Sequence, residues 1–589
     1  MAKRSKRPDR MSVQTGQQFL HQQYRRLHRQ RHHINNDAAR ILVPALPEVY
    51  TARFCIAFGR RLNYRIAHMS TLTQAQAVAG TREFEVEQSL LTIPDDLRYR
   101  ACASTNSTHK KQFGQFLTPP HVADLMAGMF RCRACTIRLL DAGAGMGMLS
   151  AAFVQRQLMR PTPPSRIEVF AYELDKEFVA GIEKTFAACR AACEARGIEF
   201  SAIVRNTDFI EEGTEMLRDD FFSTRPQTFD AAIVNPPYGK LSTASKAYRR
   251  LRSVNAATTN LYTAFLNLII GLLKPGGELV AITPRSFCNG PYFKPFRMNL
   301  LQQMAIRGIH VFDSRSTAFK YDKVLQENII LHAVKNAKAT RNIRVSHSSG
   351  ADGDTVRARI IPANEVASPD DPEAFIHIPT SERHLAARDQ ICRLKATLAT
   401  LGLTVSTGRV VAFRAREHLR PEPDKSTAPL IYPCHFQGLF IKWPKTPAKK
   451  PNAIENNSHT ANLFVPAGVY VLTKRFTSKE ERKRVVACIY SPDRVMPGPV
   501  GFENHVNYIH ANRQGLDMII AKGLWAFLNS SALDLYFRQF NGHTQVNATD
   551  LRNIRFPTAA QLDRMGNRIG DEILCQEQID QIVAEELKA

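Results

Sequence analysis

A regular alternation of short apolar runs with amphipathic segments, between residues 112 and 335, restricts the folds that this chain can adopt. The apolar runs have the length of strands, and helical patterns separate the first six of them. This alternation predicts a doubly wound α/β fold, in which helices cover both faces of a mostly parallel sheet. Only a short connection joins the last two runs, which predicts one antiparallel strand. The seven expected strands are residues 136–143, 166–173, 199–204, 229–237, 277–284, 306–312 and 327–334.

At 589 residues the chain is too long for a single hydrophobic core, and its composition divides it into five regions. Residues 1–40 are rich in Lys, Arg, Gln and His, which predicts a basic, flexible arm, with or without a phosphate-contacting role. Residues 41–111 show helical periodicity and are expected to pack on the sheet domain of residues 112–335. A polar connecting segment, residues 336–380, leads to a C-terminal domain of mixed strands and helices, residues 381–589.

The formal net charge of +25 is large even for this length. A positive field attracts polyanions, so nucleic acid is the first partner to consider, and solubility alone is the other explanation of such a charge. The C-terminal region interleaves Arg, Lys, Asn and Gln with aromatic residues, the types that contact phosphates and base edges. We therefore expect this region to bind nucleic acid.

The cysteine content and the hydropathy of the sequence predict a cytoplasmic location. Eleven cysteines are scattered along a basic sequence without a secretory pattern, and the longest apolar stretch, residues 264–273, is about half of a membrane span. Cys132 and Cys135 form a CxxC motif, but no second CxxC supplies further zinc ligands, so no metal is expected. Cys189 and Cys193 lie one helical turn apart and are expected on the buried face of a helix.

A glycine-rich turn follows the first expected strand, which runs into Asp141 and then Gly143, Gly145 and Gly147. Glycines permit a tight turn and let backbone N–H groups and a helix N-terminus approach a ligand closely. Dinucleotide, nucleotide and S-adenosylmethionine sites all use such loops, and a purely structural turn is the alternative.

Acidic residues end the next two expected strands. Glu173 lies where a carboxylate can accept hydrogen bonds from ribose hydroxyls. Asp208 could accept an adenine amino group, and Phe209 could pack on the ring. Each acid has an alternative role as a loop residue or a helix N-cap. On successive strand ends of one sheet, they together favour a cofactor that contains adenosine.

The fourth expected strand stops at Asn235, Pro236, Pro237 and Tyr238. Two consecutive prolines remove two N–H donors and fix the backbone, so nearby carbonyls stay available as acceptors. The Asn235 side-chain carbonyl and the Pro236 main-chain carbonyl could together accept both hydrogens of an exocyclic amino group, while the Tyr238 ring stacks on the base. A simple turn is the alternative.

These motifs carry a resemblance to a known family. "DAGAGMG" followed by "NPPY", with "FGQFLTPPHVADLM" upstream, resembles the amino-methylating branch of S-adenosylmethionine-dependent methyltransferases. The motif order is similar to the gamma class of N6-adenine DNA methyltransferases, which includes the TaqI-like enzymes. The stretches "ITPRSFCNGPYFKPFR", "FDSRSTAFKYDKVLQENIIL" and "GHTQVNATDLRNIRFP" look like the BsuBI/PstI branch of bacterial modification methylases. The resemblance implies the Rossmann-like, seven-stranded class I methyltransferase fold followed by a DNA-recognition domain.

The resemblance also implies a role for each matching residue. The target amino group would be bound by Asn235 and Pro236, the flipped base would stack on Tyr238, and Phe319, or in its place Phe312, would pack on the other face of the base. Pro237 would line the site shared by target and cofactor. The cofactor-binding set is Thr118 at the methionine end, Asp141, Gly143 and Gly145 in the glycine loop, Glu173 on the ribose, and Leu174, Asp208, Phe209 and Pro237 around the adenine.

The implied reaction transfers a methyl group from S-adenosylmethionine, without a metal, to N6 of an adenine flipped out of duplex DNA. Cys288 is expected to be a packed thiol, because no nucleophilic cysteine is needed. We expect a monomer, because hemimethylated duplex presents one adenine at a time. The sequence carries no convincing nuclease signature, so if the protein is part of a restriction system, cleavage is expected to reside in a separate endonuclease chain. Three other substrates or roles stay open: an RNA base, a protein glutamine amide, and a non-catalytic DNA-binding subunit with a degenerate pocket.

Overall fold

The computed structural model describes residues 89–104, 117–218, 228–313 and 327–589, apart from the single residues 339, 352, 448, 573 and 589. The predicted basic arm, most of the predicted helical segment 41–111 and Phe319 lie outside the described residues. The described end of that segment is helix α3 (Thr92–Ser104), which packs on α7 (Lys176–Glu194) of the sheet domain.

The predicted α/β sheet is present, and its strands run in the order β3-β2-β1-β4-β5-β7-β6-β8-β9. Strands β1 to β5 pair in parallel where they adjoin, and β7 is antiparallel to both of its neighbours, β5 and β6, as the short connection before it predicted. The first seven strands are β1 (Thr136–Ala142), β2 (Arg166–Tyr172), β3 (Glu199–Arg205), β4 (Phe229–Val234), β5 (Leu273–Pro284), β6 (Met304–Phe312) and β7 (Asn328–Lys335).

Two further strands extend the sheet beyond the seven that were predicted. Strand β8 (Asn342–Ser348) pairs in parallel with β6, and β9 (Arg357–Pro362) pairs antiparallel with β8. Both lie in the segment 336–380, which the sequence predicted to be a connection. The prediction was wrong there because these strands bury few apolar side chains, namely Ile343, Val345 and Ile361.

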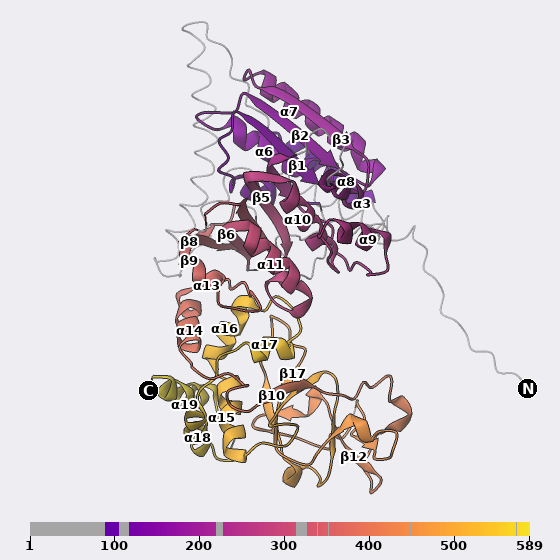
Figure 1. Ribbon diagram of the computed structural model, residues 1–589, viewed down its shortest axis with the longest axis vertical. Helices are drawn as coiled ribbons and strands as arrows, with labels where there is room; N and C mark the ends of the chain where they lie inside the picture. The colour runs from indigo at the N-terminus through magenta and orange to yellow at the C-terminus, as the bar shows by residue number, and fades with distance from the viewer. Residues whose placement is uncertain are drawn as a thin grey trace, which may run out of the picture. The chain divides into compact units, whose positions relative to one another are not determined.

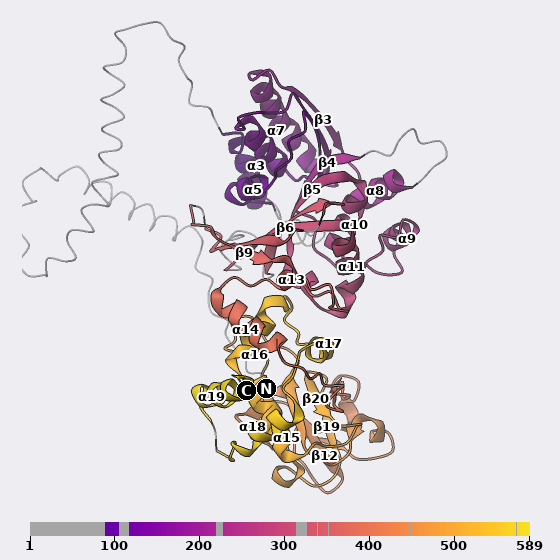
Figure 2. The ribbon, with the colours of Figure 1, turned by 60° about the vertical axis from the view of Figure 1, so that its left-hand side comes forward.

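Helices cover both faces of the sheet (Figure 2). On one face, α5 (Pro120–Ala127), α6 (Met148–Leu158) and α7 pack together, and Cys189 and Cys193 of α7 are fully buried, as their spacing predicted. On the other face lie α8 (Phe209–Leu217), α9 (Lys246–Ser253), α10 (Leu261–Leu272) and α11 (Lys294–Gln303). The most apolar of these helices is α10, which is capped by Asn260 and buried along nearly its whole length.

The C-terminal domain combines two mixed sheets with a group of helices (Figure 1). The six-stranded sheet contains β10 (Thr404–Thr407), β20 (Val506–His510), β17 (Tyr470–Lys474), β18 (Ala487–Tyr490), β14 (Phe440–Ile441) and β13 (Phe436–Gln437). The five-stranded sheet contains β11 (Leu419–Arg420), β15 (Ala453–Glu455), β12 (Thr427–Ile431), β19 (Val500–Phe502) and β16 (Phe464–Val465). The helices are α14 (Glu382–Cys392), α15 (Met518–Leu528), α16 (Ser531–Phe540), α17 (Ala548–Arg552), α18 (Ala559–Asn567) and α19 (Gln576–Lys588), with the short α13 (Ala363–Val366) before them.

A buried joint connects the two domains; it is formed by residues 285–297, which follow β5, and residues 538–550. Arg285 Nη2 donates to the carbonyls of Arg538 and Gln539, at 2.6 and 2.5 Å. Gly542 approaches so closely that a Cβ there would lie 2.4 Å from the Arg285 carbonyl oxygen. Only glycine fits this position, and the two segments are therefore held together backbone to backbone.

Within the joint, Asn289 is fully buried and bridges the two segments. Its Nδ2 donates to Asp550 Oδ2 at 3.1 Å, and its Oδ1 accepts from the backbone N–H of Gly542 at 3.2 Å. Arg297 is also fully buried and donates to the carbonyls of Phe287, Gly290 and Glu373 at 2.8 to 3.1 Å. These bonds fix the loop after β5 to both domains.

Candidate functional site

The carboxyl ends of β1, β2, β3 and β4 surround a cavity of about 230 Å³. Ligands bind at this edge in open α/β sheets, because the loops that follow the strands diverge there. Seven of the residues predicted from the sequence line the cavity: Gly143, Gly145, Glu173, Leu174, Asp208, Phe209 and Pro237, and Asn235 of the predicted target site lines it as well.

The glycine turn folds back on the end of β2. The backbone N–H groups of Gly143 and Ala144 both donate to the Tyr172 carbonyl, at 2.8 and 3.0 Å. Gly145 has a φ of +57°, and a Cβ there would lie 2.8 Å from a methyl group of Leu117. Glycine is required at this position by both the backbone conformation and the close approach.

Glu173 ties the glycine turn to the start of α7. Its Oε2 accepts from the Gly145 N–H and its Oε1 from the Asp175 N–H, both at 2.8 Å. Burial raises the pKa of Glu173 above its ordinary value. A carboxylate oxygen can accept a second hydrogen bond, so both oxygens keep acceptor capacity at the cavity wall.

Asp208 serves as the N-cap of α8, since its Oδ1 accepts from the Ile210 N–H at 2.8 Å. The helix-cap alternative is therefore confirmed, and the same side chain also lines the cavity. Phe209 is buried between Tyr172 and Phe265, with ring centroids 5.3 and 5.1 Å away. Its ring forms an apolar wall beside the carboxylate.

Asp141 and Thr118 were predicted to bind the cofactor, but neither lines the cavity. Asp141 is fully buried behind the glycine turn, where its Oδ2 accepts from the Ser150 hydroxyl at 2.7 Å. Burial raises the pKa of Asp141 to about 7. Asp141 therefore lies behind the glycine turn, where it bonds Ser150 of α6, and does not reach the cavity.

Asn235 is oriented by Thr118. Its side-chain Nδ2 donates to Thr118 Oγ1 at 3.0 Å, which fixes the amide so that Oδ1 is the group left to accept. Among the described residues, no donor bonds the carbonyl of Pro236, which is buried beside it. A side-chain acceptor and a main-chain acceptor therefore lie next to each other at the end of β4.

Tyr238 begins a series of aromatic rings that reaches the C-terminal domain. Its hydroxyl donates to Asn235 Oδ1 at 3.3 Å, and burial raises its pKa far above the ordinary value, so it stays protonated. The Tyr238 ring lies edge-on to Tyr262, Tyr262 stacks with Phe293, and Phe293 stacks with His543, at centroid distances of 6.3, 5.8 and 5.7 Å.

The sequence analysis missed several apolar lining residues, namely Leu117, Phe178, Ile210, Ala247, Leu261 and Phe265. Most belong to helices whose apolar periodicity indicates core positions, so no local signal separates the ones that face the cavity. Phe312, the competing aromatic for the second stacking position, is buried in the core on the α5–α7 face of the sheet. It does not line the cavity.

Cys288 is fully buried, as predicted, and burial raises its pKa to about 12. In the part of the chain that the structure describes, no group of three or more His, Cys, Asp or Glu side chains is placed to hold a metal ion. The same described residues contain no helix that is long and apolar enough to cross a bilayer.

Comparison with known proteins gives one family. Residues 172–319 match the family described as Eco57I restriction-modification methylase. The chain is 42% identical over 500 residues to the type II methyltransferase M.PstI of Providencia stuartii, a match that covers 85% of this chain and 98% of that protein. It is 40% identical over 470 residues to the type II methyltransferase M.BsuBI of Bacillus subtilis, covering 79% of this chain and 91% of that protein. Among solved structures, the type IIG restriction endonuclease BpuSI matches 85% of this chain and 63% of that chain, at 12% identity and a TM-score of 0.38.

Proposed function

The chain belongs to the type II modification methyltransferases that include M.PstI and M.BsuBI, and from this premise we propose that it methylates N6 of adenine in duplex DNA. Membership confirms the resemblance that the motifs carried, and with it the expected DNA methyltransferase activity and the use of S-adenosylmethionine. The choice of adenine N6 is the step that we argue from the site itself.

The observation that carries the proposal is the pair of acceptors at the end of β4. Thr118 accepts from the Asn235 Nδ2, which leaves Oδ1 as the acceptor end of the amide, and the Pro236 carbonyl beside it has no donor among the described groups. Two acceptors of this kind match the two hydrogens of a planar amino group, such as the one that adenine carries at C6. Accepting both hydrogens moves electron density toward the nitrogen and prepares its lone pair for attack.

The cavity beside these acceptors fits the adenosine part of the cofactor. A Cβ at Gly143 would find only the Asn235 carbonyl oxygen within 4 Å, so space stays open beside the turn. We assign Glu173 to the ribose hydroxyls, Asp208 to the adenine amino group, and Phe209 with Leu174 to the faces of the ring. When bound, the cofactor supplies a methyl group on a sulfonium centre that a nitrogen lone pair can attack in line.

An adenine within a duplex cannot reach this pocket, so the base must leave the helix at a cost of about a few kcal/mol. Tyr238 is placed to stack on the flipped base, which offsets part of this cost. An amide oxygen can accept two hydrogen bonds, so the Asn235 Oδ1 that accepts from the Tyr238 hydroxyl at 3.3 Å can also accept from the target amino group. The residues at the end of β4 therefore act by holding and orienting the amino group.

We also propose that the protein works as a monomer in the cytoplasm, beside a separate endonuclease that cuts the same site. The relatives support this division of labour, because M.PstI and M.BsuBI are both named as methyltransferases and align over nearly their full length. Hemimethylated duplex presents one adenine at a time, for which one subunit suffices.

The proposal is tested by modified-base sequencing of genomic DNA from cells that express this chain, with Asn235→Ala as the control. We expect N6-methyladenine at one sequence motif in the first sample and none in the second. Methylation of cytosine N4 would overturn the choice of base, and methylated RNA with unmodified DNA would overturn the choice of substrate. Methylation that persists in the Asn235→Ala sample would overturn the role of the acceptor pair.

A further inference from the structure

The C-terminal domain contains a polar hollow of about 550 Å³ at the edge of its six-stranded sheet. Three elements form it: strand β10, the end of β20 with the turn that follows, and helix α17. Its lining consists of Thr404, Ser406, Thr407, Arg409, Tyr508, His510, Asn512, Arg513, Ala548 and Arg552. We call it the arginine hollow. No acidic residue belongs to its lining.

The three arginines of the hollow have no carboxylate partner among the described residues. Arg409 donates only to the carbonyls of Asn462 and Phe464, at 3.3 and 3.4 Å, and Arg552 donates to the Val405 carbonyl at 2.9 Å. Arg513 is exposed, and no ion pair involves its side chain in the described part of the chain. All three keep their full positive charge facing solvent.

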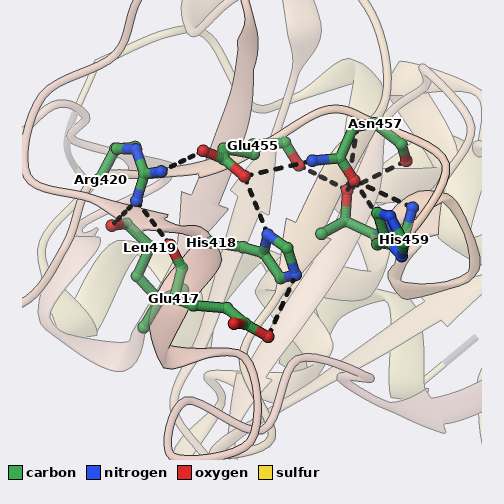
Figure 3. A network of polar contacts seen from close by, with 8 residues as sticks. Glu417, His418, Leu419, Arg420, Glu455, Asn457 and His459 are labelled. Atoms are coloured by element: carbon green, nitrogen blue, oxygen red, sulfur yellow. Dashed lines mark hydrogen bonds and ion pairs between the residues drawn. The ribbon is translucent and has the colours of Figure 1, made fainter.

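A second polar cluster of the same domain shows the contrasting arrangement (Figure 3). There Glu455 pairs with Arg420 and accepts from His418 at 2.8 Å, and Asn457 donates to the same carboxylate at 3.1 Å. Glu417 lies on the other side of the His418 ring. The Arg420 charge of this Glu455 cluster is neutralised within the protein, whereas the charges of the arginine hollow are not.

His510 sets the direction of a hydroxyl in the hollow. Its Nδ1 accepts from the backbone N–H of Arg513 at 3.0 Å, so the proton of the neutral ring is on Nε2. Nε2 lies 2.9 Å from Ser406 Oγ and donates to it, which leaves the Ser406 hydroxyl hydrogen free to donate elsewhere. Burial, together with Arg409 and Arg513, lowers the pKa of His510 and keeps the ring neutral.

One continuous segment links the hollow to the reaction site. This segment, residues 543–552, begins at His543, which stacks on Phe293 in the ring series that starts at Tyr238. The segment ends in α17, which contributes Ala548 and Arg552 to the hollow.

We propose that the arginine hollow binds the sugar-phosphate backbone of the DNA duplex, with Arg409, Arg513 and Arg552 contacting phosphate oxygens and Ser406 donating a hydrogen bond. Guanidinium groups and hydroxyls are the usual donors to phosphates. Three guanidinium groups that converge from separate elements suit a tetrahedral anion better than the flat edge of one base. The assignment rests on the proposed function, since it takes duplex DNA as the substrate.

The test measures the affinity of the full-length protein for a random-sequence 30-base-pair duplex, from about 50 to 300 mM KCl, by fluorescence anisotropy. Each lost phosphate contact lowers the slope of log K against log salt by about 0.9. We expect the double variant Arg409→Gln/Arg513→Gln to lose about 2 from this slope and to bind on the order of 50-fold more weakly at 0.1 M salt. Adding Arg552→Gln should remove about one more unit.

The control is Arg420→Gln, which removes one arginine charge, as each substitution in the hollow does, but from the neutralised Glu455 cluster; it should leave the slope unchanged. Cofactor affinity, measured by calorimetry, should be equal in all variants and shows that each is folded. A double variant with the wild-type slope would overturn the assignment, as would a loss confined to duplexes that contain the methylation site. Wild-type protein that binds no duplex would overturn the proposed function as well, so the two failures are distinct.

Discussion

The end of β4 and the arginine hollow differ in the charge and the burial of their polar groups. At the end of β4 the polar atoms are neutral, partly buried and oriented by neighbours, as Thr118 and Tyr238 orient Asn235. In the hollow the groups are charged, and Arg409, Arg513 and Arg552 reach solvent without a balancing carboxylate in their lining. Methyl transfer requires acceptors in fixed positions, while attraction of a polyanion requires free charge. The two regions should therefore fail differently when they are mutated.

The largest effect is expected at Asn235. Asn235→Ala removes one of the two acceptors, and a single preorganised group of this kind contributes about 10³-fold to a rate. Single-turnover methyl transfer should fall by about that factor, while duplex affinity and its salt dependence stay within twofold of wild type. A parallel loss of duplex affinity would show that the two regions are not separable.

A substitution in the joint should destabilise the protein as a whole, and with it both the end of β4 and the arginine hollow. Arg297→Met removes the donor from the joint carbonyls of Phe287 and Gly290 and from the carbonyl of Glu373, which should lower the free energy of unfolding by about 3 to 5 kcal/mol. Calorimetric melting measures this effect. As a control, Arg393→Met removes an exposed arginine that pairs with Asp389 one turn away, and should change stability by less than about 1 kcal/mol. Equal melting of the two variants would contradict the structural role of Arg297.

Asp550 makes the stability of the joint depend on pH. Burial raises its pKa to about 6, from an ordinary value of 3.8, so the folded state favours the protonated carboxyl. The stabilisation relative to Asp550→Asn is fully present below about pH 4 and is lost as the pH rises through 6. Urea unfolding of the wild type and of Asp550→Asn measures this effect. From pH 4 to pH 7, the difference between their free energies of unfolding should decrease by at most about 3 kcal/mol. A difference that grows with pH would mean that the carboxylate is stabilised in the joint.

The smallest effect sharpens the role of Tyr238. Tyr238→Phe keeps the ring and removes only the hydroxyl that donates to Asn235 Oδ1. Because the stacking surface remains, the rate of methyl transfer should stay within about threefold of wild type. Tyr238→Ala removes the stacking surface as well, and should slow transfer by about 10-fold or more, since base stacking on an aromatic side chain contributes about 1–3 kcal/mol. The Tyr238→Phe and Tyr238→Ala rates, measured on one duplex, separate the ring from the hydroxyl. Equal rates would assign the whole effect to the hydroxyl.

Much of the sheet and of the candidate site could be predicted from the sequence, because the signals are local. Apolar runs of strand length gave the first seven strands, and the glycines after Asp141 gave the turn that approaches the cavity. Glu173 and Asp208 were predictable because parallel strands end at one edge, which brings residues distant in the chain together there. The predicted roles of these residues toward the cofactor stay predictions.

The features that could not be predicted depend on contacts between distant segments. Strand β8 alternates its two apolar residues, Ile343 and Val345, with polar ones, so no continuous apolar run distinguishes it from a polar connection. The bond from Arg285 to the Gln539 carbonyl spans 254 residues and leaves no local pattern. The arginine hollow gathers side chains from three elements, each of which resembles an ordinary basic surface when taken alone.

The joint also determines where this protein can be recombined with its relatives. A chimera that exchanges the C-terminal domain at residue 381 would place a foreign partner opposite Asn289, and any side chain larger than hydrogen at the position of Gly542 would collide with the Arg285 carbonyl. Residues 285–297 and 538–550 must therefore be inherited as a pair. A chimera that takes both segments from one parent preserves these contacts, whereas a junction in the polar stretch near residue 381 separates them.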